Sequence, residues 1–409
     1  MGEQDNKTRA VEVRFGIIGC GGIGKWHAKS LASIPGTTLA GVTDTDKEAR
    51  DKTAKSFDVE AFDSVDAMLQ TDGIDVVSIC TPPTSHAALV TAAAEAGKHV
   101  LVEKPLALNL SDADRALAAC ASRNVQLGVV HQQRGRSATR ALHRMLLDGD
   151  LGKPLMATAI HTWFRTESQL KQDAWRGDAA AGGGVLLDQA IHAIDLLAWF
   201  LGEPRWVSGS TAVLARRTSA EDTAVATIGF DGGAVATLLA STAANAVRDD
   251  IAIEVAGTRG LCRLEIRDYD HAEIVRLELS ESDEQRAREL SAGEIESLVQ
   301  RFGGLWRRGP RSWPWRGLAL FAGRERGKRP FRDPRAFLRR KIDRIAQDET
   351  REFQGHAAIL LGMADAARGR GQPLVPGAEA RHSIAIIDAI QQSHRAGGER
   401  VELVSAGTP

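Results

Sequence analysis

Residues 13–24 read VRFGIIGCGGIG, and this stretch decides the fold of the first half of the chain. An apolar strand runs into a glycine-rich turn, and a helical segment, KWHAKSLASI over 25–34, follows. In a GxGxxG turn between a strand and a helix, Gly19 permits the tight turn, Gly21 lets a pyrophosphate approach the backbone, and Gly24 allows close helix packing. The stretch therefore predicts a dinucleotide-binding turn.

Asp44 stands where the ribose of such a dinucleotide would be recognised. It follows Gly24 by twenty residues and ends the second predicted strand, TLAGVTD. A carboxylate there can accept both ribose hydroxyls of the adenosine and repels a 2′-phosphate, so we expect NAD in preference to NADP. The alternative is a glycine turn with an unrelated surface aspartate, but strand, helix and acid in register favour the cofactor.

Strands and helices alternate regularly up to residue 132. Further buried strands are predicted over 75–81, 99–104 and 125–130, and helices over 46–56, over 85–96 and from Ser111. Regular alternation predicts the α/β class, in which helices cover both faces of a parallel sheet. We therefore assign residues 1–132 to a Rossmann dinucleotide-binding domain.

Residues 133–409 follow a different pattern. An apolar helix is predicted over 185–201, and a succession of strands follows it, with a turn at 231–233. This order predicts an α+β domain with a mostly antiparallel open sheet, which would bind the substrate. Helices can pack on one face of such a sheet, and another subunit can pack on its other face. We therefore expect a homo-oligomer, either a dimer or a tetramer.

Length and composition exclude several classes of protein. At 409 residues the chain exceeds the size of one core, so two domains are expected. It is 43% apolar and 26% charged, and no run of about 18 apolar residues predicts a membrane span. The polar first fourteen residues do not resemble a signal peptide. Four widely spaced cysteines without a CxxC pair argue against a zinc site and a disulfide framework, so we expect a cytoplasmic protein without a metal.

A basic insertion rich in Trp and Arg lies at about 284–350. Between 301 and 344, fifteen Lys and Arg outweigh three acids, a local charge of +12 that leaves −13 on the rest of a chain whose total is −1. Trp306, Trp313 and Trp315 stand between the arginines. The segment could form a subunit contact, a lid over an anionic substrate or a nucleic-acid contact. We expect the subunit contact first and no nucleic acid, because no nucleic-acid-binding module accompanies the charge.

Two further parts of the sequence resemble a known family. The run TPPTSH over 81–86, followed by AGKHVLVEKPLA over 96–107, resembles the dinucleotide-binding half of the glucose-fructose oxidoreductase, inositol dehydrogenase and rhizopine-catabolism (Gfo/Idh/MocA) superfamily. The run GGGVLLDQAIHAIDLLAWFLGEP over 182–204 resembles the same family's second signature. The resemblance implies a nicotinamide cofactor and a sugar or polyol substrate. It fades from about 284 to 350.

The resemblance also implies three catalytic residues. The family's EKP motif falls on residues 103–105 and makes Lys104 catalytic, and its DxxxH falls on Asp188 and His192. Lys104 ends a parallel strand, where open α/β sheets bind ligands. Asp188 and His192 lie four apart on one helix, and a histidine beside a carboxylate can accept a hydroxyl proton. The alternatives are a solvated lysine and a structural hydrogen bond, but the helix is otherwise apolar, so its polar residues need partners or a cleft.

These arguments give two sets of expected contacts. The cofactor is expected to contact Gly19, Gly21, Gly22, Ile23, Gly24, Asp44, Thr81, Pro82, Pro83, His86, Glu103 and Lys104. The substrate is expected to contact Lys104, His131, Arg134, Trp175, Arg176, Asp188 and His192. The stretch His131-Gln132-Gln133-Arg134 departs from the Asn or Tyr followed by Arg of many family members, so the family's substrate preferences do not transfer. The only tyrosine, Tyr269, lies elsewhere in the chain.

Three functions remain open. The first is an NAD-dependent oxidoreductase that oxidises or reduces a secondary alcohol of a sugar, a sugar derivative or a cyclitol. Lys104 would orient the hydroxyl, His192 would accept its proton, and hydride would pass to the nicotinamide C4. The second is a glycosidase that retains NAD and cycles it through oxidation, elimination, hydration and re-reduction, on an anionic sugar glycoside. The third, a silent cofactor-binding regulator, is disfavoured because all three catalytic candidates are present.

Overall fold

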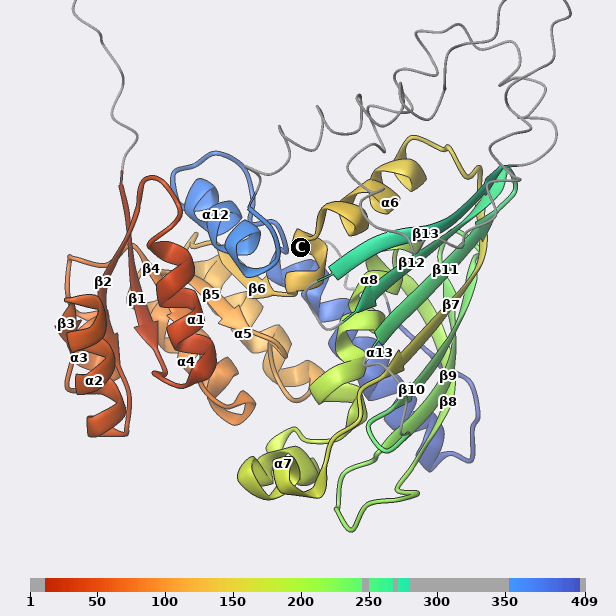
Figure 1. Ribbon diagram of the computed structural model, residues 1–409, viewed down its shortest axis with the longest axis horizontal. Coiled ribbons are helices and arrows are strands. Elements are labelled where there is room, and N and C mark those ends of the chain that lie inside the picture. The colour runs from red at the N-terminus through yellow and green to blue at the C-terminus, as the bar shows by residue number, and fades with distance from the viewer. Residues whose placement is uncertain (1–11, 245–249, 268–270, 280–352, 405–409) are drawn as a thin grey trace, which may run out of the picture. The chain divides into compact units, whose positions relative to one another are not determined.

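The structure is a computed structural model that describes residues 12–244, 250–267, 271–279 and 353–404. The chain forms two compact units, each with its own sheet (Figure 1). Unit 1 consists of Met1–Gly135, Asp178–Gly183 and Gln354–Asp388, and unit 2 consists of Arg136–Gly177, Gly184–Phe353 and Ala389–Pro409. The basic insertion predicted at about 284–350 and Tyr269 lie outside the described residues.

Unit 1 contains a six-stranded parallel sheet in the order β3-β2-β1-β4-β5-β6. Its strands are β1 (Val13–Ile18), β2 (Thr37–Thr43), β3 (Glu60–Ala61), β4 (Val76–Ile79), β5 (His99–Glu103) and β6 (Leu127–Val130). Strands β4 and β6 are buried along their whole length, as expected when helices cover both faces. The strand order is that of a Rossmann domain, which confirms the predicted fold.

The helices of unit 1 begin at capping residues that the sequence only partly reveals. They are α1 (Gly22–Leu31), α2 (Lys47–Phe57), α3 (Val65–Leu69), α4 (His86–Glu95) and α5 (Leu110–Ser122). Asn109 caps α5, since its side chain accepts a hydrogen bond from the backbone of Asp112. The predicted start at Ser111 therefore lies one residue too late.

A C-terminal segment returns to unit 1. Helix α12 (His356–Ala367) packs on α1, β5 and β6, and the first part of α13 (Gly377–Arg395) belongs to the same unit. The units therefore differ from the contiguous stretches 1–132 and 133–409 expected from the sequence. The reason is physical, because α12 buries its apolar side chains, Ile359, Leu360 and Met363 among them, on packing.

Unit 2 contains an eight-stranded sheet in the order β13-β12-β11-β7-β10-β9-β8-β14. Its strands are β7 (Pro154–Thr162), β8 (Pro204–Ala212), β9 (Thr223–Phe230), β10 (Val235–Ser241), β11 (Asp250–Gly257), β12 (Gly260–Arg267), β13 (His271–Leu279) and β14 (Val401–Glu402). Among the described strands of this sheet, β7 and β10 alone pair in parallel, which confirms the mostly antiparallel sheet. The predicted turn joins β9 to β10, with Gly233 at a φ of 85°.

Helices cover one face of this sheet. They include α6 (Ser137–Leu147), which packs on β12 and β13, and α8 (Ile191–Leu201), which packs on β7 and β10. The short helix α7 (Glu167–Gln172) contacts the turn at Ala174–Gly177. Along β10, Ala236 and Leu238 are buried, whereas Val235 and Leu239 are exposed. This alternation separates a helix-covered face from an accessible face.

One helical stretch, Ala179–Leu201, is long and apolar enough to cross a membrane. It contains no uninterrupted run of about 18 apolar residues, because a few polar residues interrupt it, so the sequence did not predict it. Of its most apolar window, 94% is buried inside the protein. This burial is typical of the core helix of a globular protein.

Candidate active site

The glycine turn between β1 and α1 has the shape that its sequence predicts. Gly19 has a φ of 102°, and a Cβ on Gly24 would lie 1.9 Å from the Gly19 carbonyl oxygen. Gly21 and Gly22 are exposed, and a Cβ on either would meet no atom within 4 Å. The neighbouring Ile23 is 45% exposed, and the first turn of α1 contains no acid. The amides at this helix N-terminus are therefore accessible, and the pyrophosphate of NAD fits them.

Asp44, directly after β2, is tied to the glycine turn. Its carboxylate accepts hydrogen bonds from the backbone nitrogens of Cys20, at 2.6 Å, and Asp46, at 2.8 Å. These bonds fix its orientation beside the turn. Because each carboxylate oxygen has a second lone pair, the group can still accept ribose hydroxyls.

Lys104 directly follows β5, so it lies at the same carboxyl edge of the parallel sheet as the glycine turn and Asp44. The residue is half-buried, and its backbone nitrogen donates to Glu103 Oε2 at 3.3 Å. Open α/β sheets bind their ligands at this edge. The structure thus brings together the glycines, the acid and the lysine in unit 1.

The loop after β4 carries four further expected cofactor contacts, Thr81, Pro82, Pro83 and His86. Pro82 is exposed and Thr81 half-buried, but His86 is only 1% exposed. Its Nδ1 lies 2.7 Å from Pro105 O and its Nε2 lies 2.8 Å from Thr81 O. Burial lowers the pKa of His86, although both carbonyls favour the protonated ring. The ring thus connects the loop after β4 to Pro105, and the cofactor contact of His86 stays a prediction.

Glu103, another expected cofactor contact, is enclosed in a cluster of ionisable groups. Its Oε1 lies 3.1 Å from His27 Nε2 and 3.8 Å from His356 Nε2, and His27 Nδ1 lies 2.8 Å from Ser78 Oγ. Burial opposes both charges, but Cys80 and Glu103 raise the pKa of His27 to about 10. Against the same burial, His27 lowers the pKa of Glu103. Glu103 therefore forms a buried ion pair with His27.

The same cluster bears on the expectation of no metal. One ligand atom each from His27, Glu103 and His356 lies within 4.8 Å of the others, so the three side chains could hold a metal ion. The sequence did not reveal this set, because its members are distant along the chain. A histidine must lose its proton to bind a metal ion, and the raised pKa of His27 favours the protonated ring. We therefore interpret the cluster as an ion pair between His27 and Glu103.

His131 and Arg134, after β6, were expected to contact the substrate. Both are only 1% exposed. Arg134 Nη1 donates to Glu379 Oε2 on α13, across 245 residues of sequence. The charge of Arg134 is thus compensated within unit 1, and this burial does not favour the expected substrate contact.

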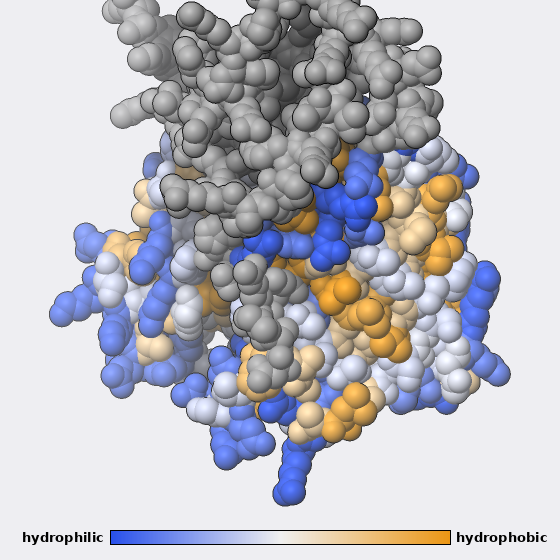
Figure 2. Space-filling model, turned by 45° about the vertical axis from the view of Figure 1, so that its right-hand side comes forward, coloured by the Kyte–Doolittle hydropathy of each residue, from blue (hydrophilic) through white to orange (hydrophobic). Residues whose placement is uncertain are grey.

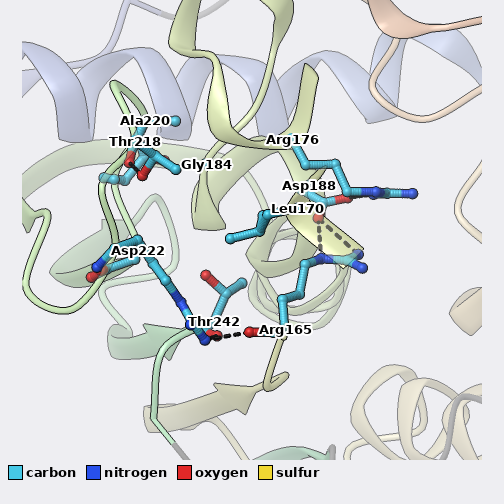
Figure 3. A pocket seen from close by; sticks show the side chains of 11 residues that line it. Arg165, Leu170, Arg176, Gly184, Asp188, Thr218, Ala220, Asp222 and Thr242 are labelled. Carbon is cyan, nitrogen blue, oxygen red and sulfur yellow. Dashed lines mark hydrogen bonds and ion pairs between the residues drawn. The ribbon is translucent and has the colours of Figure 1, made fainter. Parts of the chain in front are cut away.

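In unit 2, Asp188 joins two arginines (Figure 3). Arg165 Nε and Nη2 each lie 2.8 Å from Asp188 Oδ2, and Arg176 Nη1 donates to Oδ1. Arg176 also pairs with Asp173 at 3.0 Å, and its guanidinium lies 4.4 Å from the centre of the Trp175 ring. The structure brings together three expected substrate residues, and it adds Arg165, which no motif marked.

Asp188 lies in a π-helical turn, η5 (Leu186–Ala190), that leads directly into α8. Such turns occur frequently at functional sites. His192, four residues later, is 1% exposed, and its ring centre lies 6.4 Å from that of His161 on β7. The sequence predicted Asp188 as the carboxylate neighbour of His192, whereas the structure also gives it two arginine partners from outside the helix.

A solvent-open hollow of about 270 Å³ lies in unit 2 (Figure 3). It is lined by Arg165, Leu170, Arg176, Gly184, Asp188, Arg216, Thr218, Ala220, Glu221, Asp222 and Thr242. The sequence analysis missed Arg216, Glu221 and Asp222. The sequence places two arginines, at 216–217, and two acids, at 221–222, just before β9. This pattern could have indicated the site, but many charged surface loops have the same composition.

Comparison with known proteins decides the family. Residues 13–131 match a model described as an oxidoreductase family with an NAD-binding Rossmann fold, and residues 139–263 match the GFO/IDH/MocA C-terminal domain. The scyllo-inositol 2-dehydrogenase (NAD(+)) of Bacillus subtilis is 30% identical over 64% of this chain and 77% of its own length. The chain belongs to the Gfo/Idh/MocA oxidoreductase family.

Two further proteins resemble this Gfo/Idh/MocA chain. The UDP-N-acetylglucosamine 3-dehydrogenase of Acidithiobacillus ferrooxidans is 32% identical over 56% of the chain and 67% of its own length. The crystal structure of the WlbA dehydrogenase from Bordetella pertussis, in complex with NADH and UDP-GlcNAcA, has a TM-score of 0.76 and 25% identity, and covers 96% of this chain and 98% of its own. The Gfo/Idh/MocA chain is an NAD-dependent dehydrogenase that acts on CH–OH groups, within a family of sugar and cyclitol oxidoreductases.

Proposed function

We propose that this protein oxidises a secondary alcohol of a sugar, a sugar derivative or a cyclitol, or catalyses the reverse reaction. The observation that carries the proposal is the placement of the open glycine turn, Asp44 and Lys104 at one carboxyl edge of the sheet of unit 1. When bound, NAD supplies the hydride acceptor. Gly21, Gly22 and Ile23 would hold its pyrophosphate, and Asp44 its adenosine ribose.

Lys104 and His192 have separate roles in this proposal. The ammonium of Lys104 donates a hydrogen bond to the substrate hydroxyl and orients it, and His192 accepts the hydroxyl proton. The position of Lys104 at the ligand-binding edge supports the first role. The place of His192 in a polar cluster with His161, inside an otherwise apolar helix, supports the second.

The substrate contacts in unit 2 follow from the arginine cluster. Asp188 acts as a positioning residue, because its carboxylate holds Arg165 and Arg176 in one arrangement. Trp175 and Arg176 then present an aromatic face and a cation, a combination that suits a sugar ring. The relatives are named for a cyclitol and a nucleotide sugar, which supports the same broad substrate class here.

An activity assay tests the function directly. The purified protein is mixed anaerobically with NAD and a panel of neutral and acidic sugars, cyclitols and aryl glycosides, and absorbance at 340 nm is followed together with aglycone release. We expect stoichiometric NADH without bond cleavage. Aglycone release with catalytic NAD and no NADH accumulation would replace the dehydrogenase with the NAD-cycling glycosidase.

Two variants test the residue roles in the same assay. Lys104→Met and His192→Asn are expected to lower kcat by about 100-fold or more, the usual range for removing a positioned proton-transfer group. The affinity of His192→Asn for NADH, measured by fluorescence, is expected to stay within about threefold of the original, because His192 is not among the expected cofactor contacts. Unchanged turnover in both variants would remove the proposed roles while leaving the family assignment intact.

We also propose that the protein forms a homo-oligomer through the accessible face of its large sheet. Leu239 lies between Ile160 and Val225 in register, and the three are 48%, 41% and 43% exposed. Val235 and Met156 form a second exposed pair, and hydrophobic patches appear in this view of the surface (Figure 2). Exposed apolar surface of this kind marks an interaction site.

We place the protein in the cytoplasm. All four cysteines are free, and three of them are buried, which suits a reducing compartment. Cell fractionation with an antibody against the chain tests this placement, and recovery from an oxidising compartment would contradict it.

A further inference from the structure

Arg216 is held by a rigid loop between β8 and β9. The Asp222 carboxylate, 2% exposed as a residue, accepts hydrogen bonds from the backbone nitrogens of Leu214, Ala215 and Arg216 at 2.8–3.1 Å. Burial opposes the charge of Asp222, but these backbone donors lower its pKa. One carboxylate thus ties three successive amides and fixes the backbone from which Arg216 extends.

The guanidinium of Arg216 is fixed at its other end. Nη2 donates to the carbonyl oxygens of Arg165 and Thr242, and the group lies 5.0 Å from the centre of the Phe164 ring. Among the described residues, no carboxylate pairs with Arg216, and its buried Nε has no acceptor. Buried donors nearly always have a partner, so this orphan points to a missing acceptor.

The other charged side chains of the hollow already have hydrogen-bond or ion-pair partners. Arg165 and Arg176 share Asp188, and Asp222 faces its own loop. Glu221 accepts from the backbone nitrogen of Leu186 at 3.0 Å, at the start of the helical stretch, and burial raises the pKa of its carboxyl. Of the three arginines that line the hollow, Arg165 and Arg176 share Asp188, and Arg216 is the one for which the described residues provide no ion pair.

We propose that Arg216 binds an oxyanion of the substrate, either a carboxylate or a phosphate. This inference rests on the proposed function, because it names the substrate class of that site. Arginine presents several N–H groups in one plane and suits both anions. The hollow is open to solvent, so an anionic group of a larger substrate can approach it from outside.

Binding to the NADH-loaded full chain tests the inference without requiring turnover. The probes are glucose, glucuronate and glucose 6-phosphate, which differ in one group, together with UDP-N-acetylglucosamine and UDP-GlcNAcA, which differ in one carboxylate. Arg216→Gln is compared with Arg217→Gln, because Arg217 is an exposed arginine next in sequence. Arg216→Lys keeps the charge but loses the planar donor pair.

We expect Arg216→Gln to weaken at least one anionic probe by roughly 10- to 100-fold, the loss expected for a hydrogen bond to a charged group. The affinity of Arg216→Gln for neutral glucose should change by less than about threefold, and so should the affinity of Arg217→Gln for every probe. The affinity of Arg216→Lys for the anionic probe should lie between those of the original protein and Arg216→Gln. The probe that loses affinity distinguishes carboxylate from phosphate. Unchanged melting temperature and NADH affinity show that Arg216→Gln is folded.

Two results separate the inference from the proposed function. If Arg216→Gln binds every anionic probe as tightly as the original protein, or loses affinity for neutral and anionic probes equally, Arg216 does not bind an oxyanion. That conclusion holds even if sugars reduce NAD. If the anionic probes depend on Arg216 but no sugar of the panel yields NADH, the anion site stands and the dehydrogenase proposal fails.

Discussion

Arg165 Nε donates a 2.8 Å hydrogen bond to Asp188 Oδ2 and thereby connects the end of β7 to the π-helical turn before α8. The other oxygen of Asp188 accepts from Arg176. One buried carboxylate therefore orders two cations around the hollow of unit 2. Removing it leaves two partly buried charges without that partner, which is more costly than losing an exposed pair.

Asp188→Asn is expected to lower the free energy of unfolding by about 3–5 kcal/mol, as when one partner of a buried ion pair is removed. Urea unfolding measures the difference. Asp173→Asn is the matched control, because Asp173 also pairs with Arg176 but its side chain is 52% exposed. The control should lose less than about 0.5 kcal/mol. Equal stabilities of the two variants would show that the cluster contributes nothing as a buried pair.

The His27–Glu103 pair predicts a pH-dependent contribution to stability. The pKa of His27 rises from 6.5 to about 10 in the folded protein, so the contribution is fully present below pH 6.5 and disappears as the pH rises through 10. The melting temperature of the original protein should therefore exceed that of His27→Gln most at pH 6 and least at pH 10. A difference that stays constant across this range would mean that His27 is neutral.

His99 provides the opposite control. Burial lowers its pKa, and its Nδ1 accepts a hydrogen bond from the backbone of Gln126. A histidine whose folded pKa is lowered loses stability as the pH falls below its unfolded pKa. The melting-temperature difference between the original protein and His99→Gln should therefore shrink below pH 6.5, in the reverse direction to that of His27→Gln.

The fold could be predicted because its signals are local. The strand, glycine turn and helix at 13–34 lie within about twenty residues, and the alternating apolar runs specify parallel and antiparallel strands. The turn geometry of Gly19 and Gly24 followed from this stretch, and the position of Asp44 followed from the end of the next predicted strand. Helix spacing likewise placed Asp188 and His192 in consecutive turns.

The partners of the polar residues could not be predicted in this way. Arg134 pairs across 245 residues, and the Arg165–Asp188 bond spans 23. A sequence spacing of four identifies the face of a helix, but the packing of other elements decides which charge meets that face. The burial of His86 and Glu103 has the same origin. Both lie in motifs that mark a cofactor site, but the ring of His86 bonds to two backbone carbonyls and the carboxylate of Glu103 pairs with His27 on α1.

Cofactor preference is expected to depend on the charge of Asp44. Asp44→Asn removes the repulsion of a 2′-phosphate and keeps one side-chain oxygen, which can accept from the amide of either Cys20 or Asp46, since the two donate to different oxygens of Asp44. The ratio of NADPH to NADH affinity should rise by about tenfold or more, since one charge–charge contact is removed. Fluorescence titration measures both affinities. Asp63→Asn, at a side chain that is 92% exposed, should leave the ratio unchanged.

The oligomer is expected to depend on the apolar row across β7, β10 and β9. Leu239→Glu places a charge between Ile160 and Val225 and should dissociate the assembly without altering NADH affinity. Sedimentation velocity measures the change in mass. Val404→Glu, at a residue that is 89% exposed and outside these strands, serves as control. If Leu239→Glu sediments like the original protein, the subunits associate elsewhere.

Two glycines of the same turn should respond differently to alanine. A Cβ at Gly24 would lie 1.9 Å from the Gly19 carbonyl oxygen, so Gly24→Ala should lower the free energy of unfolding by about 1–3 kcal/mol or more, as overpacked sites do. A Cβ at Gly21 meets no atom within 4 Å, and its φ of −69° suits alanine. Gly21→Ala should therefore melt like the original protein.

The cofactor should nevertheless distinguish Gly21→Ala from the original protein. The added methyl group lies where the backbone must approach the pyrophosphate, so NADH affinity should fall by about tenfold or more while the melting temperature of the free protein is unchanged. Unchanged NADH affinity in Gly21→Ala would show that the pyrophosphate does not lie at the N-terminus of α1, because the added methyl group would obstruct a pyrophosphate bound there. Gly24→Ala cannot make this distinction, since its loss of affinity would follow from the displaced helix.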